Sequence, residues 1–310
     1  MKKKNISTIL VMILLILSLV GCDSRNKVKE EGKFYIVTTT TMLADATRII
    51  GGDYVVVTGL MGPGIDPHLY KASAGDVIAM QKADMVVFTG LHLEGKMGEV
   101  FENLNKLNKK TIKVSNGVDE SVLLQSEDKS LAHDPHIWFD VSLWKDAVSE
   151  LANGIKELDP EHSEEYENNL NKYLTELDEL DAYIKNRALE LDEEKRVLIT
   201  AHDAFNYFGQ AYGFQVKGIQ GISTSSEAGT RDLRNLANFI VENEIKAIFI
   251  ESSVPTKNIE ALKEAVEAQG FDVKIGGELY SDSLGDGKSG DDTYIKTFTK
   301  NIDTIVDALK

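Results

Sequence analysis

The stretch "DPEHSEEYENNLNKYLTELDELDAYIKNRALEL" (residues 159–191) divides the chain into two parts. Asp159 is a good N-cap, and Pro160 is a favourable first helical residue. Apolar side chains then recur at helical spacing, at Tyr166, Leu170, Tyr173, Leu177, Leu180, Ile184 and Leu191. Residues 160–191 therefore predict a single helix of roughly 48 Å. Its length and position favour a stiff connector between two lobes over an ordinary surface helix with a solvated acidic face.

Short β-branched segments lie on both sides of this helix. The first part contains "FYIVTT", "VVVTGL", "MVVFTG" and "TIKVS", and the second contains "RVLIT", "QVKGIQ", "AIFIES" and "FDVKIG". Amphipathic helical segments alternate with them, one of which starts with capping-box spacing at Ser73 and Asp76. The pattern predicts an α/β fold of two lobes, each with a mainly parallel four-stranded sheet, joined by one long rigid helix. The expected boundaries are 34–159 and 192–310 for the lobes and 160–191 for the helix.

The first 33 residues have the features of an exported lipoprotein. Lys2, Lys3 and Lys4 precede an apolar run at residues 6–20, and "LVGC" follows it directly. We interpret residues 1–21 as a signal peptide, residues 22–33 as a flexible tether and Cys22 as the site of lipid attachment. The apolar run is shorter than the ~20 residues of a spanning helix, which makes a retained transmembrane anchor the weaker interpretation. The expected location is the outer face of the cytoplasmic membrane.

Composition restricts the partners and the chemistry of the exported part. Removal of the three leader lysines from the 34 basic residues leaves 31 against 50 acidic ones, a formal charge of −19. Nucleic acid is therefore excluded as a partner. Cys22 is the only cysteine, so the body has no internal disulfide and no thiolate ligand. Any metal site must use His, Asp and Glu side chains.

The tripeptide Asp-Pro-His occurs twice, at residues 66–68 and 134–136, in a chain with only five prolines and six histidines. Proline fixes its own φ and restricts the residue before it, so each histidine leaves a stiff stretch of backbone. Asp66 and Asp134 are candidates to orient the loop or to accept an imidazole N–H, although either could be a solvated turn residue.

Four potential ligands follow predicted strands. His68 and His136 come after the second and fourth strands, His202 comes after the first strand of the second part, and Asp282 comes after the last. Ligands gather at the carboxyl ends of strands in open parallel sheets, so a cleft between the lobes could bring these side chains together. Glu251, at the end of another strand, is a candidate partner behind them.

Other side chains compete for two of these positions. His133 lies in the same loop as His136, which is favoured because it alone shares the Asp-Pro-His context. Glu278 and Asp286 flank Asp282, and the residues alone leave that choice open.

Three imidazoles and one carboxylate suit a transition ion such as Zn²⁺ or Mn²⁺ and suit Mg²⁺ or Ca²⁺ poorly. Catalytic zinc sites keep a position open for water or substrate, whereas four protein ligands close the shell. A closed shell therefore favours a protein that holds the ion over one that uses the ion for catalysis. The alternatives are a zinc-dependent hydrolase or lyase with a three-histidine site, and a surface adhesin with a structural metal.

The segments "GIDPHLYKASAGDV", "GLHLEGKMGEVF", "DPHIWFDVSLW", "LITAHDAFNYFGQAYGFQVKGIQGIST", "AIFIESSVPTKN" and "IGGELYSDSLGD" resemble the TroA-like metal receptors of ABC importers. The resemblance covers the chain from about Phe34 to its end. It implies a periplasmic-binding-type fold with a helical backbone, an ion held in the cleft, and a membrane permease and a cytoplasmic ATPase as partners. Carried over by motif, the four ligands fall on His68, His136, His202 and Asp282.

Two departures from the family pattern leave the ion open. Manganese-dedicated relatives commonly have glutamate as the third ligand, whereas "TAHDAF" has His202 there. Zinc-dedicated relatives often have a histidine-rich loop, whereas residues 126–133 contain one histidine. The leading hypothesis is a monomeric, lipid-anchored receptor that captures Zn²⁺ or Mn²⁺ and delivers it to an importer without catalysing a reaction.

Overall fold

The computed structural model describes residues 32–126, 131–225 and 229–310. The predicted signal peptide, Cys22 and nearly all of the tether lie outside these ranges. Within them, no helix is both long and apolar enough to cross a membrane.

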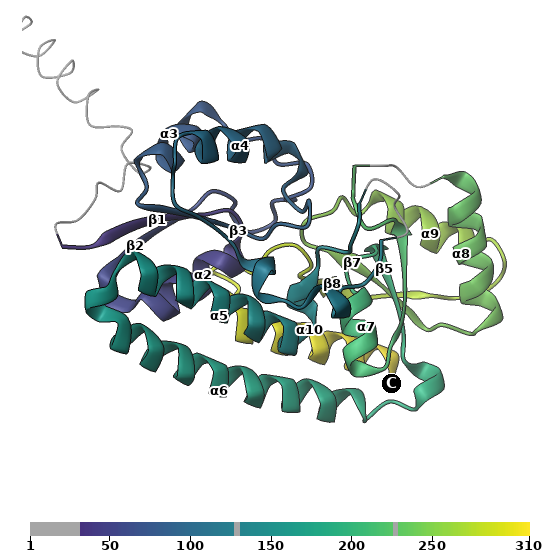
Figure 1. Ribbon diagram of the computed structural model, residues 1–310. Helices are drawn as coiled ribbons and strands as arrows, with labels where there is room; N and C mark the ends of the chain where they lie inside the picture. Colours follow the sequence, from purple (N-terminus) through teal and green to yellow (C-terminus); the bar gives the residue numbers. More distant parts are fainter. Residues whose placement is uncertain (1–31, 127–130, 226–228) are drawn as a thin grey trace, which may run out of the picture.

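The first lobe contains a four-stranded parallel sheet in the order β2-β1-β3-β4. Its strands are β1 (Phe34–Thr38), β2 (Val55–Gly59), β3 (Met85–Phe88) and β4 (Thr111–Lys113). Helices α3 (Ala74–Lys82) and α4 (Gly98–Lys106) lie on one side of the sheet, and α2 (Thr41–Gly51) and α5 (Val141–Leu158) lie on the other (Figure 1). All four strands that the sequence predicts for this lobe are present.

The capping box that the sequence predicts at α3 is confirmed. The Ser73 hydroxyl accepts from the backbone N–H of Asp76, and the Asp76 carboxylate accepts from the backbone N–H of Ser73. Asp76 also accepts a hydrogen bond from the Tyr70 hydroxyl at 2.8 Å. These bonds fix the end of the loop between β2 and α3, in which His68 lies.

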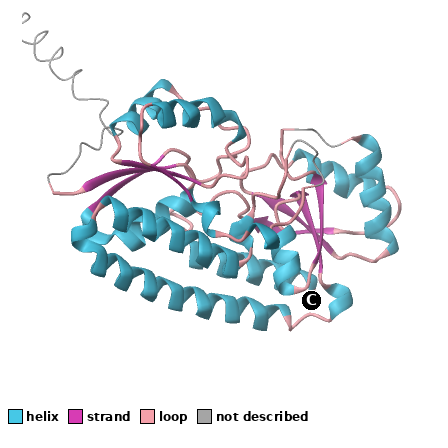
Figure 2. Ribbon diagram, viewed as in Figure 1, coloured by secondary structure: helices cyan, strands magenta, loops and turns pink. Residues whose placement is uncertain are grey.

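The second lobe contains β5 (Val197–His202), β6 (Gln215–Gln220), β7 (Ala247–Glu251) and β8 (Lys274–Leu279). Its helices are α7 (Asn206–Tyr212), α8 (Thr230–Glu242), α9 (Lys257–Glu267) and α10 (Tyr294–Leu309). The predicted four-stranded sheet is present as two parallel pairs, β5–β6 and β7–β8, with β5 lying beside β7. At this seam the backbone N–H of His202 donates to the Glu251 carboxylate, a side-chain bond in place of a strand-to-strand one. The strands of the two lobes form two separate groups (Figure 2).

Strand β8 lies three residues later than the sequence predicts. A Cβ atom at Gly276 would lie 2.7 Å from both the Ala308 and Phe249 side chains, so only glycine lets the strand pass this close to α10. Gly277 has a φ of 148°, which also favours glycine. The sequence did not predict the end of this strand correctly, because it contains two adjacent glycines and glycine is depleted in most strands.

The long connector is α6 (Ser163–Ala188), shorter than the predicted helix. A 3₁₀ turn (Pro160–His162) precedes it. Asp159 does not cap it; its carboxylate accepts from the Tyr166 hydroxyl at 2.7 Å and bonds Nδ1 of His162 at 2.8 Å. Twenty-six residues correspond to roughly 39 Å of helix. The lobe boundaries given above remain predictions.

Helix α6 joins the lobes through packing as well as through the chain. Its predicted apolar stripe is buried and lies against α2 and α5 of the first lobe and α10 of the second. Aromatic rings continue this core between the lobes: Phe139 packs on Phe205 with centroids 4.2 Å apart, and Trp144 stacks on Tyr294 at 5.2 Å. The connector is therefore part of a core that both lobes share.

Asp45 on α2 lies in this core, 9% exposed, and accepts a hydrogen bond of 2.9 Å from the backbone N–H of Tyr294 at the start of α10. Burial raises the pKa of Asp45 to about 6. A raised carboxyl pKa means that the folded state favours the protonated form, so the fold loses stability as pH rises from about 4 to about 6.

We expect Asp45→Asn to be more stable than the wild type by up to about 3 kcal/mol at pH 7.5 and by about 1 kcal/mol at pH 4.5. Urea unfolding of the metal-free proteins at the two pH values measures the difference. The same change at exposed Asp53 controls for the loss of a surface charge. A variant that is less stable than the wild type at pH 7.5 contradicts the expectation.

Candidate metal centre

The structure places the four predicted side chains at the carboxyl ends of strands from both lobes. His68 lies in the loop between β2 and α3, and His136 directly precedes the 3₁₀ turn (Ile137–Phe139) that leads into α5. His202 is the last residue of β5, and Asp282 follows β8. All four are buried.

Each of the four side chains offers one ligand atom, and these atoms all lie within 4.8 Å of one another. Nε2 of His68 lies 3.2 Å from Nε2 of His136, which is 3.5 Å from Oδ1 of Asp282. Nε2 of His202 lies 3.4 Å from Oδ2 of Asp282. Ligand atoms that surround one ion tetrahedrally at about 2.0–2.1 Å lie about 3.3 Å from one another. The spacing therefore fits a single transition-metal ion.

Two of these atoms make no hydrogen bond to any described residue, namely Nε2 of His202 and Oδ1 of Asp282. Buried polar atoms rarely go unpaired, because each one costs about 1–3 kcal/mol. Both residues belong to the group whose ligand atoms lie within 4.8 Å of one another, and a divalent cation among these atoms would satisfy both. Three imidazole nitrogens and a carboxylate oxygen thus fit a divalent transition-metal ion.

The repeated Asp-Pro-His tripeptide forms the same turn twice. Oδ1 of Asp66 accepts from the backbone N–H of His68 at 2.8 Å, and Oδ1 of Asp134 accepts from that of His136 at 2.9 Å. Each aspartate therefore fixes the backbone of its histidine across the intervening proline. This turn gives a physical reason for the repetition.

The two aspartates differ in their second contact. Oδ1 of Asp134 also lies 2.7 Å from Nδ1 of His136, so the imidazole N–H donates to it and Nε2 points at the site. Oδ2 of Asp66 instead accepts from the Thr224 hydroxyl at 2.5 Å, across the junction of the lobes. Asp66 thus orients the loop of His68 and bonds the second lobe.

Glu251 holds His202 as Asp134 holds His136. Its Oε2 lies 2.6 Å from Nδ1 of His202, and its Oε1 accepts from the backbone N–H of His202 at 2.9 Å. Both side chains are fully buried. The carboxylate fixes the tautomer that leaves Nε2 free and increases the basicity of the ring.

The pKa values of the metal-free site show competition between burial and charge. Burial lowers the pKa of His68 to about 3, so this imidazole is neutral. Burial would also lower the pKa of His136, but the carboxylates of Asp134 and Asp282 raise it above its usual value. Glu251 and Asp282 outweigh burial in the same way and raise the pKa of His202 well above its usual value.

Burial would raise the pKa of Asp282, but His202 and His136 hold it well below its usual value. The carboxylate is therefore ionised and attracts positive charge into the site. A bound divalent cation replaces the protons on the two histidines, so binding should release protons.

The competing residues lie outside this cluster. His133 bonds Gln125 and lies 3.5 Å from Glu120. Glu278 is an exposed residue of β8, and Asp286 accepts from the backbone of Lys288 and Ser289. Neither carboxylate belongs to the group of four.

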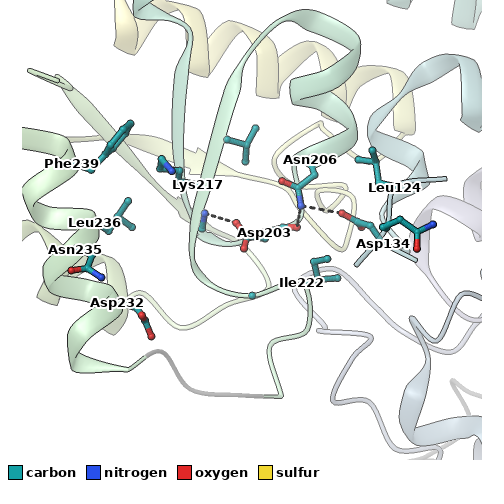
Figure 3. Close-up of a pocket in the computed structure, with 14 residues that line it drawn as sticks. Leu124, Asp134, Asp203, Asn206, Lys217, Ile222, Asp232, Asn235, Leu236 and Phe239 are labelled. Atoms are coloured by element: carbon teal, nitrogen blue, oxygen red, sulfur yellow. Dashed lines mark hydrogen bonds between the residues drawn. The ribbon is translucent and has the colours of Figure 1, made fainter. Parts of the chain in front are cut away.

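A separate cavity of about 790 Å³ is lined mostly by residues of the second lobe, with Leu124, Gln125 and Asp134 from the first. Of the four candidate ligands and the three carboxylates predicted to support them, only Asp134 lines this cavity (Figure 3). There the Asn206 side chain donates to Oδ2 of Asp134 at 3.1 Å. The cavity is larger than an ion needs, whereas the four ligand atoms enclose a space of ionic size.

Several supporting residues were absent from the sequence prediction. Asn206 and Tyr207 of α7 bond the carboxylate and the carbonyl of Asp134, and Trp138 bonds the loop of Asp282. Asn206 and Trp138 lie only four and two residues after predicted ligands, and that proximity is the one signal that the sequence offers.

The chain has two α/β lobes with parallel strands, joined by a helical connector, and three imidazoles and a carboxylate converge between the lobes. These features define the class of two-lobed metal-binding receptors. Residues 36–308 match the family described as the zinc-uptake complex component A, periplasmic (ZnuA). The chain belongs to this family.

Known proteins of the same kind are similar over most of their length. The zinc-binding protein TroA of Treponema pallidum is 49% identical over 279 residues, covering 90% of each chain. The manganese-binding lipoprotein MntA of Bacillus subtilis is 43% identical, covering 94% of this chain and 95% of that protein. The structure of the periplasmic zinc-binding protein TroA from Treponema pallidum superposes with a TM-score of 0.87, covering 90% of this chain and 99% of that one.

We expect Glu251→Gln to weaken metal binding about 10- to 100-fold, because a neutral amide no longer increases the basicity of His202. Competition with a chromogenic chelator measures the change. Glu264→Gln, at an exposed position on α9, removes the same charge far from the histidine and should leave the affinity unchanged. Equal affinities for Glu251→Gln and the wild type would contradict this role.

Proposed function

We propose that this protein is an extracytoplasmic receptor that binds Zn²⁺ or Mn²⁺ and delivers it to an ABC importer. The observation that carries the proposal is the convergence of four buried ligand atoms, from both lobes, within 4.8 Å. In this proposal His68, His136, His202 and Asp282 bind the ion, and Asp134 and Glu251 orient two of the imidazoles. Asp66 supports the loop of His68.

The identity of the ion follows from the donor atoms and the relatives. Three nitrogens and one carboxylate suit borderline transition ions. One similar protein is described as zinc-binding and another as manganese-binding. We therefore propose Zn²⁺ or Mn²⁺ as the substrate of this receptor.

Four protein ligands support a receptor over a hydrolase or lyase. A catalytic zinc keeps a position open for the water that it activates. Here all four positions of a tetrahedral shell are supplied by side chains, two of them held by buried carboxylates. The site is built to hold an ion and later to give it up when the lobes separate.

The partners and location are further parts of the proposal. Several similar proteins are described as substrate-binding lipoproteins of manganese ABC transporters. Together with the lipobox, this supports attachment of a lipid to Cys22 and a place on the outer face of the cytoplasmic membrane. The partners would be a permease and its ATPase, and the receptor would act as a monomer.

We expect Zn²⁺ or Mn²⁺ to raise the melting temperature of chelator-stripped protein, because the ion binds the folded state and the unfolded chain has no preformed site. At a free ion concentration a thousandfold above Kd, the gain is about 4 kcal/mol. His202→Ala should weaken binding by at least about a hundredfold and abolish most of this gain.

His92→Ala is the matched control, because His92 is exposed and lies outside the four-residue cluster. Its melting temperature should rise with metal as that of the wild type does. No rise in the wild type with either ion would refute the proposed function.

A further inference from the structure

Asp282 belongs to the second lobe, yet a side chain of the first lobe holds its loop. The indole N–H of Trp138 donates to the carbonyl oxygen of Ser281, the residue before Asp282, at 3.0 Å. Trp138 is 1% exposed and lies in the 3₁₀ turn that begins after His136. The bond therefore joins the loops of the second and fourth ligands across the lobes.

The same indole contacts the second ligand. Its ring meets the imidazole of His136 edge to face, with centroids 5.2 Å apart and planes at 70°. The backbone of Trp138 is held in turn, because the Tyr294 hydroxyl donates to its carbonyl oxygen at 2.6 Å. A rigidly placed indole thus touches one ligand and fixes the backbone beside another.

Two more bonds from the first lobe hold the residues after Asp282. The Ser283 hydroxyl accepts from the backbone N–H of Gly64, and the Thr41 hydroxyl accepts from that of Leu284, each at 2.8 Å. From the second lobe, the Asn301 amide bonds both the N–H and the carbonyl of Tyr280. From the second lobe too, the Ser253 hydroxyl bonds the Ser281 hydroxyl at 2.9 Å and donates to Oδ2 of Asp282 at 3.4 Å. The loop of Asp282 is therefore held from the first lobe on both sides of Asp282, and from its own lobe through Tyr280 and Ser253.

We propose that Trp138 is a positioning residue for metal binding: through the carbonyl of Ser281 it places the Asp282 carboxylate against the ion and slows release of the ion. The inference rests on the proposed function and deepens it. Retention of the ion then depends in part on Trp138, which does not contact the ion.

Trp138→Phe keeps an aromatic ring in the core and removes the one N–H that bonds Ser281. The loop of Asp282 then loses a buried bond, and we expect Zn²⁺ to dissociate about tenfold faster. The visible absorption of the Co²⁺ form should change too, because its bands depend on the number and geometry of the ligands.

Trp144→Phe is the matched control. Trp144 is equally buried, and its indole N–H donates to the Tyr173 hydroxyl at 3.3 Å, away from the four ligands. It should lower the melting temperature and leave Zn²⁺ dissociation and the Co²⁺ spectrum unchanged. Thr41→Val removes another first-lobe bond to the same loop and should speed dissociation a few-fold.

The experiment measures Zn²⁺ dissociation into excess chelator and the Co²⁺ spectrum for the wild type and the three variants. Faster release and an altered spectrum in Trp138→Phe, with Trp144→Phe like the wild type, support the proposal. The proposal is wrong if Trp138→Phe releases Zn²⁺ at the wild-type rate, or if both tryptophan variants release Zn²⁺ equally fast. If Trp138→Phe does not fold, Thr41→Val decides in the same way. A wild type that binds neither ion refutes the proposed function itself.

Discussion

The buried carboxylate of Asp282 is the constraint on which the rest of the structure depends. An ionised carboxylate is costly inside a protein unless positive charge compensates it. Three imidazoles surround it, and two of them rest on further buried carboxylates, Asp134 and Glu251. Neutral imidazoles carry no charge, so with three neutral imidazoles the site has an excess of negative charge from these carboxylates. Protons balance it in part in the metal-free protein, and a divalent cation balances it better.

The ligand loops are held by bonds that cross between the lobes. The loop of His136, from the first lobe, is bonded by Asn206 and Tyr207 of the second. The loop of Asp282, from the second lobe, is bonded by Trp138, Thr41 and Gly64 of the first. Separation of the lobes must break these bonds together with the bonds to the ion. Such coupling would make release of the ion a cooperative event that an importer could drive.

Strand positions and the grouping of the three candidate histidines were predictable from the sequence because they depend on local patterns, whereas the choice of Asp282 over Glu278 and Asp286 needed the family resemblance. Seven of the eight strands lie at or within two residues of their predicted ends, and the four candidate ligands follow strand ends in accordance with the general rule for parallel sheets. The start of α6 was missed because Asp159 bonds Tyr166 and His162 instead of capping the helix. These partners lie only seven and three residues along the chain, but helical periodicity does not reveal which of them Asp159 bonds. Trp138 and Asn206 were missed for a different reason, because their partners lie 143 and 72 residues away in the chain.

X-ray absorption of the zinc-loaded protein tests the central claim most directly, because it counts the atoms around the ion. The account predicts three imidazole nitrogens at about 2.0–2.1 Å, together with carboxylate oxygen and no bound water. Replacement of Asp282 by alanine should remove that oxygen and admit water. A wild-type spectrum with fewer than three imidazoles, or with water in the shell, would contradict a site closed by side chains from both lobes.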